Sequence, residues 1–433
     1  MATSLEQIIL FRVIQGLAGG GLQPSSQGVL LDSFPPEKQG AAQTVFGVAA
    51  LLAPVVGPTL GGYLTVTYDW RWIFYINVPV GAVALVMCYF LVHDPAYLKQ
   101  ERAEMRRRRL NFDYLGVGLL ALFMACWEIT LSKGQEWDWL RDAFGRVQTL
   151  LVLLVLSLGA LIFWEMRSSN PVINFRVLKE RNLAVSCLII FSAYGVLYGA
   201  STSLPGLLQS LFGYDAYVSG LVQSPSGMFS ILTLLVVGAV LGRGVDARWM
   251  IAAGLLVMAA GCYWMALMNL SISPWQVVWP RVVTICGLSM IFAPLNLAAF
   301  KYIPTHLRGA AVGLFALLRN EGGSVGTSMA QTIQERRLQF HVSRLGDYLG
   351  PLNPHVNSFL EQGQSFFEQR TGDPAGSRLR AVQALEDLRQ QQAASLAYFD
   401  VFWACAVLGV ALVFLVPLMK RSVAEKGAHV GAE

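Results

Sequence analysis

The chain has 433 residues, of which 55% are hydrophobic and 14% are charged, and its formal net charge is +5. A soluble domain carries roughly 25% charged residues, so this chain has too little charge to cover its apolar bulk in water, and lipid is the expected solvent. The basic residues lie in loops without interleaved aromatic residues, which argues against a nucleic-acid surface. The six cysteines lie in separate apolar runs, so neither a metal site nor a disulfide framework is predicted.

Eleven apolar segments follow one another along the chain, each close to the length of about 20 residues that a membrane-spanning helix needs. The sequence therefore predicts an all-α integral membrane protein. The expected spans are 5–30, 40–67, 73–93, 113–132, 147–165, 183–211, 217–241, 249–269, 275–299, 309–332 and 396–419.

The short loops differ strongly in basic charge. The loops after the odd-numbered spans up to the ninth, together with the C-terminal tail, hold 18 Lys and Arg residues, whereas the short loops on the other side hold 4. Because basic loops stay in the cytoplasm, we expect a cytoplasmic C-terminus. With eleven spans the N-terminus would then lie outside, which hints that a preceding part of the protein is absent from this sequence.

One long polar segment, about 333–395, separates the last two spans. It is expected on the extracytoplasmic side, because long loops translocate largely regardless of their charge. Leu379, Val382, Leu385 and Leu388 within it recur with a helical period. This period predicts a helix, either simply solvated or serving as a docking surface for a partner.

Charged residues within the predicted spans are the first candidates for function, because each costs about 2.5–3.5 kcal/mol at the centre of a membrane helix. Arg12 lies in the first span and needs a carboxylate, a carbonyl or a water-filled cavity as its partner; a structural ion pair is the alternative. Arg319 and Glu321 lie two residues apart in the tenth span, point in different directions, and could serve coupling or helix packing. Glu128 in the fourth span could titrate or simply lie at the interface.

Three other charged residues are interpreted differently. Glu165 and Asp400 lie near the ends of their spans and are expected to anchor them at the interface. Arg281 follows Pro280 early in the ninth span, where its long side chain could reach the membrane surface.

A run of prolines and glycines lies in the second span. Pro54 and Pro58 each remove a backbone hydrogen bond and bend the helix, while Gly57, Gly61 and Gly62 leave a flat surface for another helix. Ordinary small-residue packing is one interpretation, and a hinge or seal is the other. The sequence contains no metal-spaced histidines and no phosphate-binding loop, so no enzyme activity, ATP-driven pump or cofactor is predicted.

Several motifs together resemble a known family. Phe11 to Gly20, with Arg12, Gln15 and Gly16, looks like an R-x-x-Q-G motif, and Pro54 to Gly62 looks like an antiporter signature. Trp70 to Gly81 contains W-R-W-I-F-Y-I-N-V-P-V-G, with Asn77 and Pro79. Asn170 to Val172 and Arg319 with Gly322 to Thr327 continue the match. In this order and spacing they resemble the fourteen-helix drug:proton antiporters of the major facilitator superfamily, of the EmrB/QacA type.

The resemblance implies a fold and a function. The motifs belong to the fourth, fifth and sixth helices of that family, so its first three helices are expected to be missing from this sequence. The implied parts are a remainder of an N-terminal bundle (1–93), a basic loop with two inserted helices (94–182) and a C-terminal bundle (183–433).

In the implied function, inward-moving protons drive export of hydrophobic small molecules through the inner membrane of a didermal bacterium. Arg12 would take part in proton transfer, and the proline–glycine run would control closure. The long loop favours the EmrB side of the family, which implies a periplasmic adaptor protein and an outer-membrane channel as partners. The alternative is a truncated membrane remnant that no longer transports.

Overall fold

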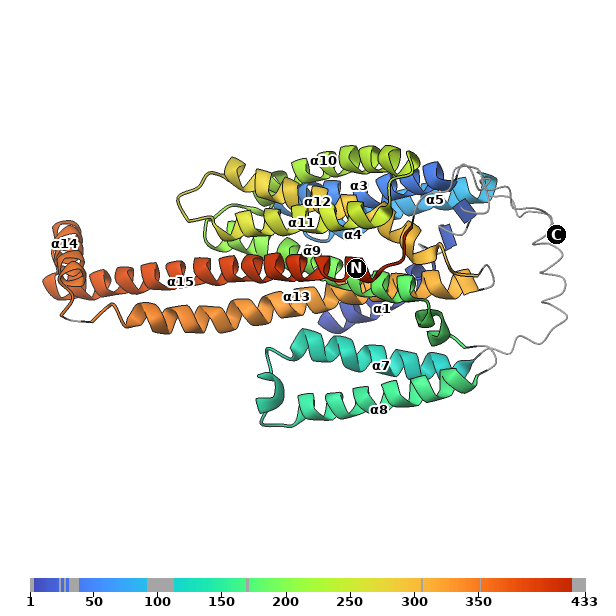
Figure 1. Ribbon diagram of the computed structural model, residues 1–433. Coiled ribbons are helices and arrows are strands. Elements are labelled where there is room, and N and C mark those ends of the chain that lie inside the picture. Colours follow the sequence, from blue (N-terminus) through green and yellow to red (C-terminus); the bar gives the residue numbers. More distant parts are fainter. Residues whose placement is uncertain are drawn as a thin grey trace, which may run out of the picture.

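The computed structural model describes residues 4–22, 25–26, 29–30, 39–91, 113–168, 171–304, 307–350 and 352–422. Its long helices run roughly side by side along one axis (Figure 1). The earlier helices are α1 (Leu5–Gly19), α3 (Gln39–Thr67), α4 (Trp72–Tyr75), α5 (Asn77–Leu91), α7 (Tyr114–Lys133) and α8 (Arg146–Arg167). The later helices are α9 (Arg181–Ser210), α10 (Ala216–Gly242), α11 (Ala247–Ala266), α12 (Pro274–Phe300), α13 (Arg308–Gly346), α14 (Pro354–Thr371) and α15 (Pro374–Val413).

Aspartates fix the starts of several of these helices. Asp113, Asp215 and Asp246 precede α7, α10 and α11, and each side chain accepts a hydrogen bond from a backbone N–H in the first turn. Such caps satisfy donors that a helix leaves unpaired at its N-terminus. The short polar loops between apolar runs therefore set where each helix begins.

The predicted membrane character is confirmed. Among the described residues, 8 helices are long and apolar enough to cross a membrane. They correspond to the predicted spans from 73–93 to 275–299 and to 396–419. The other three predicted spans are helical as well and correspond to α1, α3 and α13.

The packed core lies among the later helices. Ile189 and Leu204 of α9, Ile251 of α11, Ile291 of α12 and Phe402 of α15 each have an exposed fraction of 0%. In contrast, no side chain of α1 or α5 is buried in the structure. The later helices thus form a bundle with an interior of its own, against which α3 packs through α10.

Helices α9 and α13 cross at unusually close range. A Cβ atom on Gly322 would overlap the backbone carbonyl of Phe191, and one on Gly326 would overlap the backbone of Gly195. Gly199 lies against the carbonyl of Gly326 from the other side. Both helices therefore carry glycines four residues apart at the crossing, the arrangement that lets membrane helices bring their backbones together.

Helices α7 and α8 form a pair at the side of the bundle (Figure 1). The pair contacts the bundle through α13, where Ser328 Oγ donates a hydrogen bond of 2.7 Å to the carbonyl oxygen of Leu131 in α7. This contact places one face of α7 next to the middle of α13.

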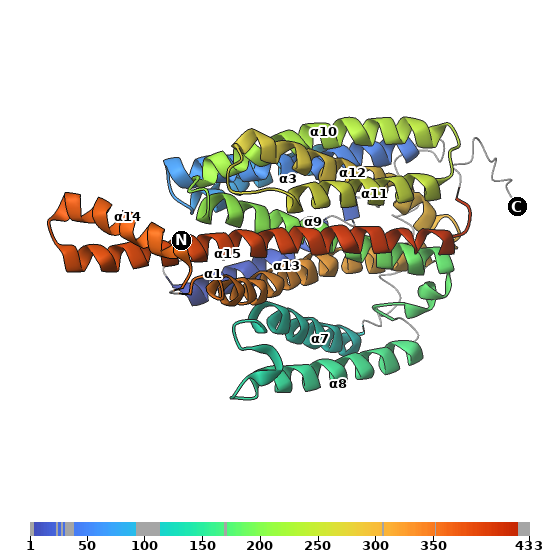
Figure 2. The ribbon, with the colours of Figure 1, turned by 60° about the vertical axis from the view of Figure 1, so that its left-hand side comes forward.

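The segment 333–395, predicted as a long loop between two spans with a helical stretch near its end, is mostly helical. Helix α13 continues to Gly346, α14 follows, and α15 begins at Pro374, so that α13 and α15 extend together beyond the other helices (Figures 1 and 2). No proline interrupts α13 after Arg308, and the turn into α15 uses Gly372 at φ +69° followed by an Asp373 cap. The helical period around Leu379 to Leu388 predicted the first part of α15 correctly.

Candidate functional site

Two of the predicted candidates, Glu128 and Glu321, face each other. Glu128 lies on α7 and Glu321 on α13, and the carboxyl group of Glu321 lies beside that of Glu128 and the indole of Trp127. Both glutamates are only partly exposed. The contact of α7 with α13 creates this pair, so two carboxylates that are far apart in the sequence share one site between a lateral helix and the bundle.

Arg319 lies on the same helix as Glu321 but belongs to a different contact. Its guanidinium lies 5.6 Å from the ring centroid of Tyr194 on α9, a distance at which a cation is attracted by the face of an aromatic ring. As predicted from their spacing, Arg319 and Glu321 point toward different neighbours. The middle of α13 therefore carries a cation toward α9 and a carboxylate toward α7.

Arg12 lies on α1, where its Nη1 donates a hydrogen bond of 3.0 Å to Oε1 of Gln15. Its guanidinium also lies 5.3 Å from the ring centroid of Phe74. Gln15 is thus a direct partner of Arg12, while Gly16 has open space around it. Among the described residues no carboxylate pairs with Arg12, so its expected charge partner is not found there.

Asn77 and Pro79 lie at the start of α5. The side chain of Asn77 donates a hydrogen bond of 2.9 Å to the carbonyl oxygen of Ile73, which ties α5 to the short helix α4. Pro79 is in the first turn of α5, where its missing N–H would have no helical partner in any case. The two residues shape the bend between α4 and α5.

The proline–glycine run (Pro54 to Gly62) lies in α3 and packs against α10. A Cβ on Gly62 would overlap the backbone of Ala216, and a Cβ on Gly220 would lie 2.5 Å from the carbonyl oxygen of Pro58. The hydroxyl groups of Thr59 and Ser224 form a hydrogen bond across the same contact.

The other members of the run do not take part in that close approach. Gly57 and Gly61 have open space where a Cβ would be, and the side chain of Pro54 is outside the described residues. The crossing of α3 and α10 is therefore made by Pro58, Thr59 and Gly62 of the run.

A second carboxylate pair was not predicted from the sequence. Asp113, the N-cap of α7, and Glu165 of α8 converge on Gly116, where a Cβ would lie 2.8 and 2.7 Å from their oxygens. The backbone N–H of Gly116 and the indole N–H of Trp164 each donate a hydrogen bond of 2.8 Å to Asp113 Oδ1. Glu165, expected as an interfacial anchor, is only 3% exposed. Asp113 at a helix start predicts a cap, but nothing in the sequence predicts its neighbour.

Arg281 was expected to reach the membrane surface, but it does not. It is 6% exposed, and its Nη2 donates a hydrogen bond of 2.5 Å to Ser201 Oγ on α9. Its side chain therefore points from α12 toward α9, inside the bundle.

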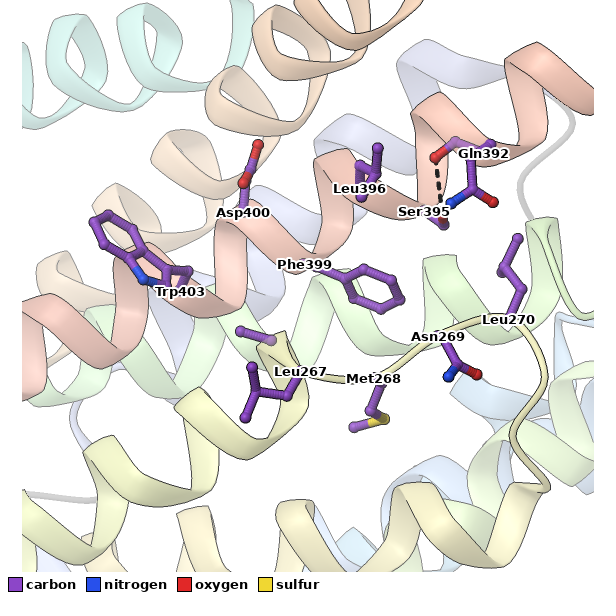
Figure 3. Close-up of a pocket in the computed structure, with 11 residues that line it drawn as sticks. Leu267, Met268, Asn269, Leu270, Gln392, Ser395, Leu396, Phe399, Asp400 and Trp403 are labelled. Carbon is purple, nitrogen blue, oxygen red and sulfur yellow. Dashed lines mark hydrogen bonds between the residues drawn. The ribbon is translucent and has the colours of Figure 1, made fainter. Parts of the chain in front are cut away.

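Asp400, expected as an anchor near the end of its span, pairs with two residues of α13. Its Oδ2 accepts hydrogen bonds of 2.5 Å from Arg337 Nε and 2.7 Å from His341 Nε2. These bonds clamp α15 to α13 where both helices leave the bundle. Asp400 also lines a pocket of about 340 Å³ next to the α11–α12 connection, together with Phe399, Trp403 and Met268 among others (Figure 3).

Comparison with known proteins identifies the family. Residues 1–327 match the sequence pattern of the Major Facilitator Superfamily. The chain belongs to this superfamily.

Three relatives from the superfamily match most of the chain. The multidrug export protein EmrB of Haemophilus influenzae is 34% identical over 367 residues, covering 84% of this chain and 70% of that protein. The multidrug export protein EmrB of Escherichia coli is 30% identical over 440 residues, covering 100% of this chain and 81% of that protein. The fatty acid resistance protein FarB of Neisseria gonorrhoeae is 28% identical over 420 residues, with coverages of 97% and 79%.

These matches confirm the family resemblance that the motifs of α1, α3 and α4–α5 indicated. The chain is a multi-pass membrane transporter of the Major Facilitator Superfamily, in the drug:proton antiporter group. The roles of individual residues remain predictions, including those of Arg12, Glu128, Arg319 and Glu321.

Proposed function

We propose that this protein is a proton-coupled secondary transporter that exports hydrophobic drugs or other toxic compounds across the bacterial inner membrane. The observation that carries the proposal is the pairing of Glu128 with Glu321 between α7 and α13. Ionisable residues inside a membrane are costly and commonly mark proton relays. The similarity to two proteins named for multidrug export supports export as the direction of transport and drugs as the substrates.

In the proposed mechanism the carboxylate pair takes up and releases the driving proton. When both carboxylates are charged they repel each other, and a proton on either one removes the repulsion between α7 and α13. Because α13 packs on α9 through glycines, a shift of α13 is transmitted to the later bundle as a whole. The crossing of α3 and α10 then opens or closes as the two halves rock around a central site.

The remaining parts of the proposal concern topology and partners. The C-terminus lies in the cytoplasm, and the projecting helices around α14 lie on the opposite side. There they would meet a periplasmic adaptor protein, which would connect to an outer-membrane channel. The division into 1–93, 94–182 and 183–433 assigns α7 and α8 to an inserted pair, in keeping with their lateral position (Figure 1).

Transport in everted membrane vesicles tests the proposal. A proton gradient should drive uptake of a hydrophobic dye by the wild-type protein, and Glu321→Gln and Glu128→Gln should each reduce this uptake at least about ten-fold, because removing an essential proton site leaves nothing to couple. Counterflow of labelled for unlabelled dye needs no net proton movement and should persist in both variants.

Glu361→Gln is the matched control, because Glu361 is an exposed glutamate on α14 far from the pair in the chain. It should transport like the wild type. Wild-type uptake in both Glu128→Gln and Glu321→Gln would overturn the assignment of the proton site. A correctly inserted wild-type protein without uptake or counterflow would instead favour the alternative, a membrane remnant without transport activity.

A further inference from the structure

Glu165 of α8 carries a buried carboxyl group without a hydrogen-bond partner. The residue is 3% exposed, and in the part of the chain that the structure describes both of its carboxyl oxygens are buried and unpartnered. The backbone N–H groups of Val172 and Ile173 lie near the carboxyl group, but neither has hydrogen-bonding geometry. A charged carboxylate is strongly unfavourable in such a position, because burying an unpaired charge costs far more than burying a neutral polar group.

The charged group beside Glu165 is a second carboxylate, that of Asp113 at the start of α7. A Cβ atom on Gly116 would lie 2.7 Å from Oε1 of Glu165 and 2.8 Å from Oδ2 of Asp113. These two oxygens are therefore no more than 5.5 Å apart, the sum of the two distances. Carboxylates this close disfavour each other's charged form, so the pair is most stable with one proton on it.

Asp113 is the member of the pair whose charge the structure supports. Its Oδ1 accepts hydrogen bonds of 2.8 Å from the backbone N–H of Gly116 and from the indole N–H of Trp164. Its Oδ2 accepts a longer bond of 3.0 Å from the same indole, and the hydroxyl of Ser168 lies beside this carboxylate as well. Hydrogen bonds to a charged group favour the charged form. The proton therefore belongs on Glu165, which has no such donors.

The positive groups near Glu165 are engaged elsewhere. Arg167, two residues further along α8, lies 3.8 Å from the centroid of an aromatic ring. Arg176 of the short helix η3 (Phe175–Lys179), which packs against α8, donates a hydrogen bond of 3.2 Å to a backbone carbonyl oxygen. Within the described ranges neither arginine bonds to Glu165, and Asp113 is the charged group that faces it. A proton can neutralise this carboxyl group without any cavity to hold it.

We propose that Glu165 and Asp113 hold one proton between them at neutral pH and form a second proton-binding site, distant from Glu128 on the same helix. The O–H group of Glu165 donates to Oδ2 of Asp113, which links the end of α8 to the start of α7. Asp113 lies about 22 Å along α7 from Glu128, so the two carboxylate pairs are separate. When the proton leaves for water, the carboxylates repel each other, and charged Glu165 turns to the N–H groups of Val172 and Ile173. Binding of one proton thus closes the α7–α8 pair, and its release loosens it.

Infrared spectroscopy of the purified full chain, in a detergent that lacks carbonyl groups, tests this site. The C=O stretch of a protonated carboxyl group is separate from the bands of a carboxylate. At pH 7 the wild-type spectrum should contain a carboxylic-acid band that the spectrum of Glu165→Gln lacks. The same difference should appear in a Glu321→Gln background, where the other pair cannot produce it. Glu361→Gln, which changes an exposed glutamate of α14, should keep the band. Identical spectra of wild type and Glu165→Gln in this region would show an ionised Glu165 and overturn the proposal.

A second variant tests whether Asp113 shares the proton. Asparagine at this position keeps the N-cap of α7, and its amide can donate a hydrogen bond to a charged Glu165. Asp113→Asn should therefore weaken proton binding by Glu165 at least about ten-fold, seen as a titration midpoint of the band at least about one pH unit lower. An unchanged midpoint would mean that burial alone keeps the proton, and the shared site would be wrong. This variant also decides the question if Glu165→Gln fails to fold.

The inference goes beyond the proposed function and does not depend on it. The uptake assay with Glu128→Gln and Glu321→Gln tests the coupling site, whereas the infrared band tests the second pair. If both variants take up dye like the wild type while the band follows Glu165 and Asp113, the proposed coupling site fails and the second pair stands. If both variants lose uptake but wild type lacks the band, the coupling site stands and the second pair fails.

Discussion

The two glycine-lined helix crossings, α9–α13 and α3–α10, have the same kind of close backbone contact, but the side chains around them differ in exposure. In both, glycines let one backbone press against a carbonyl of the other. The α9–α13 crossing is surrounded by side chains such as Ala193 and Val196, with exposed fractions of 0% and 1%. Beside the α3–α10 crossing, Val56, Leu60 and Leu221 are exposed to 44%, 38% and 43%.

This difference indicates which crossing can open. The α9–α13 contact is part of the bundle interior, so separating it would expose a large apolar surface that packing now covers. The α3–α10 contact is closed by Gly62, Gly220 and the hydroxyl pair of Thr59 and Ser224, and the side chains beside it are partly exposed. The first crossing should therefore be permanent, and the second should separate during transport.

Disrupting the permanent crossing should have the largest effect. Leucine at Gly326 would push into the backbone of Gly195, which cannot move aside as a flexible side chain can. The expected result is a loss of the folded protein, because the cost should exceed the ~1–3 kcal/mol typical of overpacking against side chains. Size-exclusion chromatography and thermal unfolding in detergent measure it. Gly313→Leu is the control, since Gly313 on the same helix has open space at its Cβ position; equal stability of the two variants would contradict the close crossing.

Locking the second crossing should leave the fold intact and stop transport. Thr59→Cys with Ser224→Cys replaces two hydroxyls that already touch, so oxidation should link them efficiently. The expected result is at least about ten-fold slower vesicle uptake, restored by a reductant, because alternating access requires this surface to separate. Thr59→Cys with Thr233→Cys is the control pair, since position 233 lies about 13 Å further along α10. Full uptake by the cross-linked protein would show that α3 and α10 stay together throughout transport.

The sequence predicted the elements of this comparison better than their contacts. Apolar segments of membrane length placed the helices, and the small residues of the proline–glycine run predicted close packing of α3. Neither signal predicts which helix packs against the small residues of α3. Glu128 and Glu321 were identified singly, because a charge within an apolar segment is visible in the sequence. Their pairing depends on the lateral placement of α7 against α13, which no local pattern encodes.

One prediction was wrong and one was incomplete. Arg281 was expected to reach the surface because a charged side chain was assigned to water, and 333–395 was expected as a loop between two spans, with a helix only around Leu379 to Leu388. Arg281 instead points inward to Ser201, and the polar residues after Gln334 continue α13 as a solvated helix. Polarity alone does not determine whether a residue on a helix faces water or a buried partner, and it does not end a helix that lacks a proline or a capping residue.

The smallest effect should come from acid, acting on the later bundle alone. Asp246, the cap of α11, also accepts hydrogen bonds from Arg248 and from the backbone N–H of Ser422, which ties the chain beyond α15 to α11. Burial opposes the charge of Asp246, but these hydrogen bonds outweigh it and hold its pKa below the usual value of 3.8. Its contribution to stability is therefore complete above about pH 4 and should be lost as the pH falls through the lowered pKa.

Thermal unfolding between pH 3 and 7 measures this contribution. Asp246→Asn should lower the stability by about 1–3 kcal/mol at pH 7 and should flatten the acid limb of the wild-type profile. Cross-linking of positions 59 and 224 should not change in this variant. The hydrogen bonds of Asp246 join α11 to the segment after α15 and do not involve the α3–α10 crossing. A change in cross-linking would mean that the contact of α11 with the segment after α15 is energetically coupled to the α3–α10 crossing.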